Sequence, residues 1–247
     1  MSEPDWALAE PVSAPDEGEI HVWLGSLEAP ADRIAQIAST LSAEEQARIA
    51  RFRFQRERRR YTVRRATLRM LLGTFLDTPP RTIRFAYGAH GKPSIATPAS
   101  GARLRFNLSD ADDLALYAFT LDRELGVDIE GVRAMPDASD IAERFFSAAE
   151  YAVFQSVPTA KQPDAFFNCW TRKEAFVKAI GDGLTCPLDC FEVSLLPGEP
   201  AVMLRMRDDD GGASRWTFWH LEPLPGYVGA VTVEARDLSV VCRRLAW

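Results

Sequence analysis

The sequence predicts an α+β protein built from two similar halves in one chain. Strand-like and helix-like segments alternate along its 247 residues, and a similar run of helix and strand recurs on either side of residue 125. At roughly 150 residues per domain, this length suits one large domain or two small ones. Hydrophobic residues make up 47% of the chain and charged residues 26%, which excludes fibrous and largely disordered classes.

In the first half, residues 20–124, periodicity predicts two helices between strands. Ser42 and Glu45 have the spacing of a capping box, which opens a helix near residue 43. A longer helix begins at Phe54 and ends before Pro79, because its apolar residues recur at helical spacing and proline closes it. The other predicted segments are strands at 20–27, 104–108 and 114–119, and a loop-rich stretch at 83–101.

In the second half, residues 125–247, a strand follows a tight polar turn at 122–124. A helix is predicted at 137–154, and another at 164–180 ends at Gly181, a residue suited to a left-handed C-cap. The remaining pattern predicts strands, at 125–129, 190–196, 201–207, 215–222 and 228–234.

Residues 1–19 form an acidic leader with six Asp and Glu residues and no Lys or Arg. We expect this segment to be flexible, and its charge is the opposite of that of a secretory signal. The chain has no apolar run of 18 or more residues, which excludes a helical membrane-spanning protein. Four cysteines are too few for a disulfide framework in a chain of this size, so we expect a cytoplasmic protein.

The charge of the chain is unevenly distributed. Residues 48–69 contain ten arginines and one acid, a charge of +9, whereas the whole chain carries −6. The rest of the chain therefore carries −15. One basic stripe on an acidic body indicates a localised anionic partner: a phosphate-bearing small molecule, an acidic protein or a nucleic acid.

A pair of carboxylates lies in the segment Gly126-Val127-Asp128-Ile129-Glu130. In a strand, Asp128 and Glu130 project from the same face, about 6.6 Å apart along the chain. Two carboxylates at this spacing suit a magnesium ion that keeps part of its water shell. Taken alone, the pattern also fits a solvated polar strand face.

A second group lies in the helical segment Trp170 to Lys178. Trp170, Glu174 and Lys178 are successive i, i+4 neighbours and share one stripe of the helix. Glu174 can serve as a third carboxylate ligand or as a general base, with Lys178 beside it as a phosphate partner. The alternative is an ordinary surface ion pair between Glu174 and Lys178.

Two weaker segments precede these groups, Gly91-Lys92-Pro93 and Phe106-Asn107-Leu108-Ser109. Taken in order, the sequences G-K-P, F-N-L-S, G-V-D-I-E and W-T-R-K-E-A-F-V-K resemble those of the 4′-phosphopantetheinyl transferases, in particular the large, single-chain, pseudo-dimeric Sfp type. The resemblance extends over residues 42–184. The last two sequences carry most of it.

This resemblance implies a fold of two related α/β halves, each a small antiparallel sheet packed on a long helix, with the active site in the cleft between them. It implies coenzyme A as co-substrate, Mg²⁺ as cofactor, and transfer of the phosphopantetheine arm to a serine of an acyl or peptidyl carrier protein. By match of sequence, Asp128, Glu130 and Glu174 would bind the metal, and Glu174, Lys178 and Asp128 would be catalytic. The expected coenzyme A contacts are Arg48, Arg60, Lys92, Ser109 and Lys178. Trp170 would anchor the helix.

One position departs from the family pattern. Members commonly have His after the sequence F-N-x-S, where it resembles a contact to the 3′-phosphate of coenzyme A, but this chain has Asp110. We expect Asp110 to point away from the phosphate, or a base such as Lys92 or Arg103 to compensate its charge.

Other functions fit parts of the sequence. The same three carboxylates would serve a Mg²⁺-dependent hydrolase of a coenzyme A-like pyrophosphate. Residues 48–69 alone would suit a non-enzymatic module that binds anions or nucleic acid, although the acidic remainder disfavours this. Under the transferase interpretation we expect a monomer that binds neither nucleic acid nor membrane. The sequence does not indicate whether the carrier belongs to fatty-acid, polyketide or nonribosomal-peptide synthesis.

Overall fold

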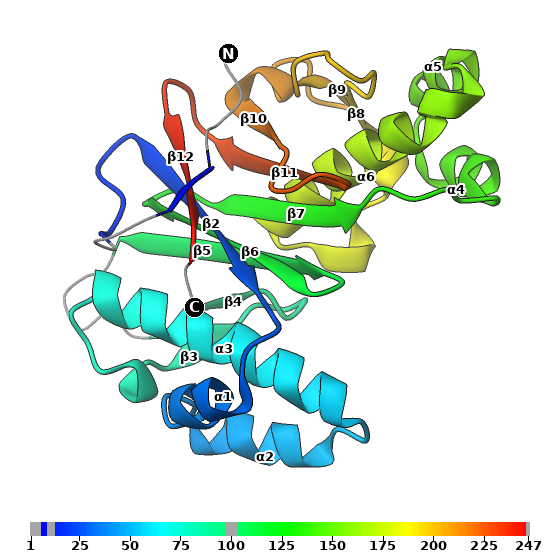
Figure 1. Cartoon of the computed structure of the whole chain (residues 1–247). Helices are drawn as coiled ribbons and strands as arrows, with labels where there is room; N and C mark the ends of the chain where they lie inside the picture. Colours follow the sequence, from blue (N-terminus) through cyan, green and yellow to red (C-terminus); the bar gives the residue numbers. More distant parts are fainter. Residues whose placement is uncertain (1–5, 9–12, 97–102, 246–247) are drawn as a thin grey trace.

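The computed structural model describes residues 6–8, 13–96 and 103–245 (Figure 1). The first half contains β2 (Glu19–Ser26), α1 (Ala31–Ala38), α2 (Ala43–Arg51), α3 (Gln55–Phe75), β3 (Phe85–Tyr87), β4 (Pro93–Ile95), β5 (Leu104–Ala111) and β6 (Leu114–Leu121). The second half contains β7 (Leu125–Gly131), α4 (Ala138–Phe145), α5 (Ala148–Ser156), α6 (Gln162–Ile180), β8 (Phe191–Val193), β9 (Met203–Met206), β10 (Trp216–Leu221) and β11 (Tyr227–Glu234). Strands β1 (Trp6–Leu8) and β12 (Ser239–Arg244) lie near the ends, and short 3₁₀ turns occupy Pro80–Thr82, Thr159–Lys161, Gly183–Thr185, Leu188–Cys190 and Ala213–Arg215.

The two halves repeat one topology, which confirms the predicted fold class. In the first half β2 pairs antiparallel with β6, which pairs antiparallel with β5; in the second half β7, β11 and β10 pair in the same way. Each half also passes from its first strand through three helices and a two-stranded hairpin before its last two strands. Strand β12 then adds to β2, and β1 adds to β12, both in parallel orientation.

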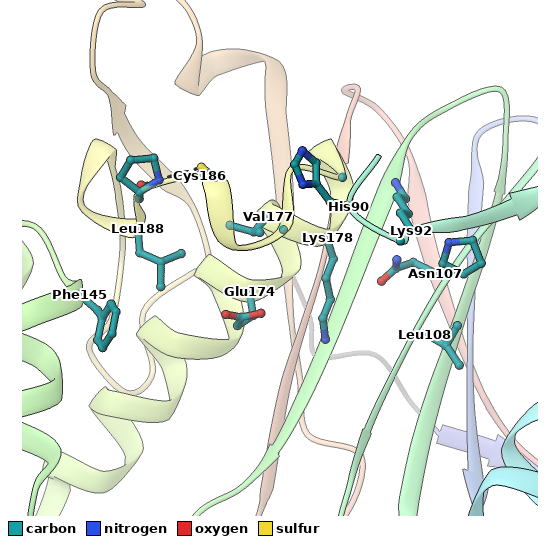
Figure 2. A pocket seen from close by; sticks show the side chains of 15 residues that line it. His90, Lys92, Asn107, Leu108, Phe145, Glu174, Val177, Lys178, Cys186 and Leu188 are labelled. Atoms are coloured by element: carbon teal, nitrogen blue, oxygen red, sulfur yellow. Dashed lines mark hydrogen bonds between the residues drawn. The ribbon is translucent and has the colours of Figure 1, made fainter. Parts of the chain in front are cut away.

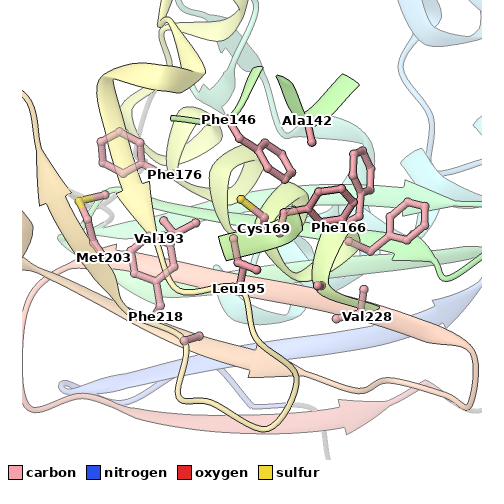
Figure 3. Packing of buried hydrophobic residues seen from close by; sticks show 14 of the residues in the cluster. Ala142, Phe146, Phe166, Cys169, Phe176, Val193, Leu195, Met203, Phe218 and Val228 are labelled. Atoms are coloured by element: carbon pink, nitrogen blue, oxygen red, sulfur yellow. The ribbon is translucent and has the colours of Figure 1, made fainter. Parts of the chain in front are cut away.

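The halves pack as four layers, with two sheets between two groups of helices (Figure 1). Apolar residues of β2 and β6 meet those of β7, β10 and β11 in a buried core between the sheets. The opposite face of the first sheet packs on α3, through residues such as Trp23 and Phe119. In the second half an aromatic core surrounds α6, and Figure 3 shows Cys169 of this helix next to Phe146 and Phe166.

The structure differs from the predicted elements at several places. Helix α1 (Ala31–Ala38) was not predicted, so the first half has three helices where two were expected. The helix expected at 137–154 is two helices, because Ser147 begins a new helix with a capping box of its own. The turn at 122–124 does not make a hairpin: β7 leaves the first sheet and pairs with β11. Residues 239–244 form a strand that the sequence pattern did not predict.

The predicted acidic leader lies partly outside the described residues, at 1–5 and 9–12, and Trp6–Leu8 forms strand β1. Residues 97–101 of the predicted loop also lie outside the described part, and β3 and β4 pair within the rest of it. Within the described ranges, no helix has the length and apolar content needed to cross a membrane.

Each half is held by a buried carboxylate at the start of its second helix. Glu45 completes the capping box with Ser42 and accepts hydrogen bonds from Arg65 and Arg69 of α3, at 2.8 and 2.6 Å. Burial alone would raise the pKa of Glu45, but the hydrogen bond from Arg69 and the other partners outweigh it and lower this pKa. Arg69 also donates to the carbonyls of residues 80 and 83, which follow the helix.

The second half repeats this arrangement. Glu150 completes a capping box with Ser147, and its Oε2 lies 2.8 Å from Nζ of Lys173 on α6. Lys173 donates in turn to the carbonyls of Leu188 and Phe191, at 2.6 and 2.7 Å. The side chains of Glu150 and Lys173 are 2% and 0% exposed, so water cannot replace either partner.

We predict that Glu150→Gln lowers the free energy of unfolding by about 3–5 kcal/mol, because it leaves the Lys173 charge buried without a counter-ion. The measurement is urea denaturation followed by circular dichroism. Glu143→Gln, an exposed position on α4, is the matched control and should change the free energy by less than about 0.5 kcal/mol. Equal effects of the two variants would show that the buried pair does not anchor the half.

Candidate active site

Strand β7 and helix α6 lie in close contact and bring the predicted carboxylates together. A Cβ atom at Gly126 would lie 1.9 Å from the carbonyl oxygen of Ala175, so only glycine allows this approach. Val127 and its alternate neighbours on β7 face the core between the sheets. Asp128 and Glu130 therefore project from the opposite face of β7, as the strand pattern predicted.

Asp128 is buried at the centre of this group, with 4% of its surface exposed. Its Oδ1 atom accepts hydrogen bonds from Nζ of Lys178, at 2.6 Å, and from Oγ of Ser109, at 2.7 Å. Its Oδ2 atom is buried too and has no hydrogen-bond partner among the residues that the structure describes. A buried carboxylate oxygen without a partner is unusual and marks a position where a cation would be stabilised.

Glu130 and Glu174 are half-buried and feel the charge of Asp128. Burial is the larger cause that raises the pKa of each, and repulsion from Asp128 raises it further. Lys178 opposes both shifts. Three carboxylates thus share one region of negative potential, which a cation would relieve.

The oxygen donors of this group match the preference of Mg²⁺. Among the described residues, no three His, Cys, Asp or Glu side chains converge closely enough to enclose a metal ion. Mg²⁺ commonly keeps several water ligands and binds proteins through only one or two carboxylates plus substrate phosphates. The donor set, with the unpartnered Oδ2 of Asp128, therefore fits a magnesium ion that is shared with a phosphate ligand.

A pocket of about 500 Å³ opens beside this group. Figure 2 shows Glu174 and Lys178 in the middle of its wall, with Phe145 and Leu188 on one side and Lys92 and Asn107 on the other. Its two ends therefore differ in chemistry. The remaining lining comes mainly from the β3–β4 turn and the loop after α6, at His90, Gly91, Pro93, Leu108, Val177, Gly181, Gly183, Cys186 and Pro187.

Lys92 joins the first half to the end of α6. Its ammonium group donates to the carbonyl of Ala179 and to Glu124, both at 2.7 Å, and more weakly to the carbonyl of Leu125 at 3.4 Å. Gly181 ends α6 with a φ of 79°, as predicted, and lies against the Lys92 side chain. Lys92 lines the pocket, with its charge balanced by Glu124.

The predicted arginine contacts lie outside this pocket. Arg60 lies 3.7 Å from Asp110 and 3.8 Å from Asp113, two carboxylates at the turn between β5 and β6. Arg48 is exposed on α2 and lies over the ring of Tyr61, beside a separate hollow of about 650 Å³. The structure therefore groups Asp128, Glu130, Glu174, Lys178 and Ser109, adds Lys92 through the pocket, and leaves Arg48 and Arg60 along α2 and α3.

The charge of Asp110 is compensated, but by other bases than expected. Asp110 pairs with Arg64 and Arg60 of α3. Lys92 is occupied by Glu124, and Arg103 pairs with Glu17 and Asp122. The arginine stripe thus supplies the compensation.

Two features of the site were missed from sequence. Phe145 and Leu188 form the apolar end of the pocket, and they carried no signal because isolated apolar residues usually belong to a core. Asn107 was given no role of its own, although it is buried at the junction of the halves; its neighbour Ser109 was predicted as a site residue through the resemblance. Trp170 packs in parallel on Phe166 and edge-on to Phe145, consistent with its expected role as an anchor.

Comparison with known proteins identifies the family of this chain. Residues 124–232 match the model of the 4′-phosphopantetheinyl transferase superfamily, and residues 28–121 match the model of a 4′-phosphopantetheinyl transferase N-terminal domain. The chain is 38% identical over 215 residues to the 4′-phosphopantetheinyl transferase HetI of Nostoc sp., covering 87% of each chain.

It is 31% identical over 199 residues to the 4′-phosphopantetheinyl transferase Sfp of Bacillus subtilis, covering 81% of this chain and 84% of the relative. It is also 32% identical over 192 residues to the human L-aminoadipate-semialdehyde dehydrogenase-phosphopantetheinyl transferase, covering 72% and 62%. On these matches, the chain belongs to the 4′-phosphopantetheinyl transferase superfamily.

Proposed function

We propose that this protein transfers the 4′-phosphopantetheine arm of coenzyme A to a serine of an apo acyl or peptidyl carrier protein and releases 3′,5′-ADP. Its family membership supports the reaction. The observation that carries the assignment of residues is the convergence of Asp128, Glu174 and Lys178 beside one pocket at the junction of the halves.

We assign Asp128, Glu130 and Glu174 as the residues that would hold Mg²⁺. The unpartnered Oδ2 of Asp128 and the raised pKa values of the two glutamates support this donor set. When bound, the ion would neutralise charge on the transferred phosphoryl group and its leaving oxygen.

Lys178 is assigned to the pyrophosphate of coenzyme A, and Glu174 to the attacking serine of the carrier protein. The ammonium of Lys178, with 29% of its side chain exposed, can pair with pyrophosphate oxygens as their charge grows during transfer. Glu174 lies one helical turn away on α6 and accepts the proton of the attacking serine. A positioned general base of this kind commonly contributes about 10²–10⁴ in rate.

The nucleotide end of coenzyme A would meet Lys92, Arg60 and Arg48. Lys92 lies at the polar end of the pocket, and Arg60 follows along α3. Both side chains have carboxylate partners, so the phosphates would replace Glu124 beside Lys92 and Asp110 beside Arg60. Asp128 supports catalysis by holding Lys178.

We further propose a monomer that acts in the cytoplasm and binds no nucleic acid. Two fused halves with a shared apolar core already complete the site within one chain. We keep residues 20–124 as the half that contacts coenzyme A phosphates and residues 125–247 as the half with the metal and catalytic groups.

The reaction is tested by intact-mass spectrometry of an apo carrier protein incubated with the enzyme, coenzyme A and Mg²⁺. We expect the mass of one phosphopantetheine to be added. EDTA should abolish the addition, and Glu174→Gln should slow it by about 10²–10⁴. Glu143→Gln should leave the rate unchanged. Cleavage of coenzyme A without carrier modification would contradict the transferase and favour the pyrophosphate hydrolase.

Glu174→Gln should also stabilise the metal-free protein. Ionised Glu174 lies near Asp128, and relief of a like-charge repulsion of about 1 kcal/mol corresponds to roughly 2–4 °C in Tm. Because the pKa of Glu174 is raised in the folded state, its ionised form lowers stability as pH rises above 4.5. The gain in Tm of Glu174→Gln in EDTA should thus be larger at pH 7 than at pH 5. A loss of Tm at pH 7 would contradict the repulsion.

Asp110→Asn should strengthen the binding of coenzyme A. The change frees Arg60 and Arg64 from their shared counter-ion, and a gain of about 1 kcal/mol would lower KM roughly fivefold. The KM for 3′-dephospho-coenzyme A should change less, since this donor lacks the 3′-phosphate. Asp210→Asn, an exposed position of the second half, is the control. An equal fall of both KM values would place the two arginines away from the 3′-phosphate.

A further inference from the structure

The two sheets meet at their edges beside the carboxylates. Strand β5 is the last strand of the first sheet, and β7 is the last strand of the second. Side chains of β5 bridge the gap: Oδ1 of Asn107 accepts a hydrogen bond from the backbone nitrogen of Val127, at 3.0 Å, and Ser109 donates to Asp128. Asn107 and Ser109 are two residues apart on one strand, so they reach β7 from the same face.

The direction of the hydroxyl proton of Ser109 follows from its partners. Nζ of Lys178 lies 2.8 Å from Oγ of Ser109, and a lysine ammonium can only donate. The hydroxyl therefore accepts from Lys178 and directs its own proton to Oδ1 of Asp128. Both donors thus engage Oδ1, and Oδ2 is left buried without a partner.

We propose that Ser109 is a positioning residue for the metal rather than a contact of coenzyme A. Its hydroxyl fixes the rotation of the Asp128 carboxylate, so that Oδ2 stays directed to the cation. This inference rests on the proposed function, because it takes Asp128 as a metal ligand. Groups that hydrogen-bond to a metal ligand commonly tune metal affinity by 10–100-fold.

Lys178 alone cannot provide this orientation. Its ammonium ends a flexible side chain that is 29% exposed, and we assign it to the pyrophosphate. Ser109 lies on a paired strand, is 7% exposed and reaches Asp128 through a single rotatable bond. The serine therefore keeps the carboxylate in place while Lys178 changes partners.

The experiment measures binding of Mn²⁺, a paramagnetic substitute for Mg²⁺, from the loss of the free-ion EPR signal. Titrations are made with the protein alone and with saturating coenzyme A, in the absence of carrier protein. Ser109→Ala should raise the Kd for Mn²⁺ by about 10–100-fold, whereas KM for coenzyme A at saturating metal stays within about twofold of wild type.

Two further variants complete the test. Ser109→Thr keeps the hydroxyl on a strand that accommodates β-branching, and its Kd for Mn²⁺ should lie within about threefold of wild type. Ser194→Ala removes another buried hydroxyl, one that bonds to the carbonyl of Pro200 in the second half. This control can lower stability but should leave Mn²⁺ binding unchanged.

The outcomes separate this inference from the proposed function. If Ser109→Ala raises KM for coenzyme A without changing the Kd for Mn²⁺, Ser109 contacts coenzyme A and the inference is wrong. If wild type transfers phosphopantetheine but binds no Mn²⁺, the metal site is wrong and the inference fails with it. If the Mn²⁺ pattern holds but no carrier is modified, the inference stands and the transferase proposal fails.

Discussion

Each half depends on an ion pair between a buried glutamate and a basic side chain of its long helix. In the second half this pair fixes the geometry of the candidate site as well as the fold. Lys173 binds Glu150 and two carbonyls of the loop after α6, and the next residue along the helix is Glu174. Because Lys173 points into the core, its neighbour emerges about 100° further round the helix, towards the pocket. The same loop contributes Leu188 to the pocket wall. The buried ammonium of Lys173 therefore helps to position both Glu174 on the helix and Leu188 on the loop.

The repeat also shows why the charged groups of α6 have no counterparts on α3. Arg69 of α3 and Lys173 of α6 occupy equivalent positions, since each binds a capping-box glutamate and two carbonyls beyond its helix. Counting from these residues, Glu174 corresponds to Met70 and Lys178 to Thr74. Met70 packs against the core of the first half, and the hydroxyl of Thr74 bonds to the backbone of its own helix. The duplicated scaffold is thus retained in both halves, while charged groups suited to a metal and a phosphate occur at these positions only in the second.

The sequence predicted those features that depend on neighbouring residues along the chain. Alternation placed Asp128 and Glu130 on one face of β7, and the i, i+4 spacing placed Glu174 and Lys178 on one stripe of α6. The capping box at Ser42 was found, whereas its equivalent at Ser147 was hidden because apolar residues continue through both α4 and α5. Strand β12 was missed because its partner, β2, lies more than 200 residues away in the sequence. The partners of Lys92 and Asp110 escaped prediction for the same reason: each ion pair joins elements that only the tertiary fold brings together.

The cations around the site are paired with carboxylates before any ligand binds. Lys178 pairs with Asp128, Lys92 with Glu124, and Arg60 and Arg64 with the turn between β5 and β6. Arg65 and Arg69 are buried against Glu45 and cannot reach a ligand. The arginine stripe, which the sequence presents as one block of charge, is therefore divided in the fold. Among the arginines of α3, carboxylate partners are found for Arg60, Arg64, Arg65 and Arg69. Others, on α2, before α3 and in its first turns, are exposed: Arg48, Arg51, Arg53, Arg58 and Arg59. Under the proposed function, a compact anion with phosphates at separate points would replace one carboxylate at each point. Such exchange would keep each of these cations paired and would let coenzyme A bind to a chain whose net charge is negative.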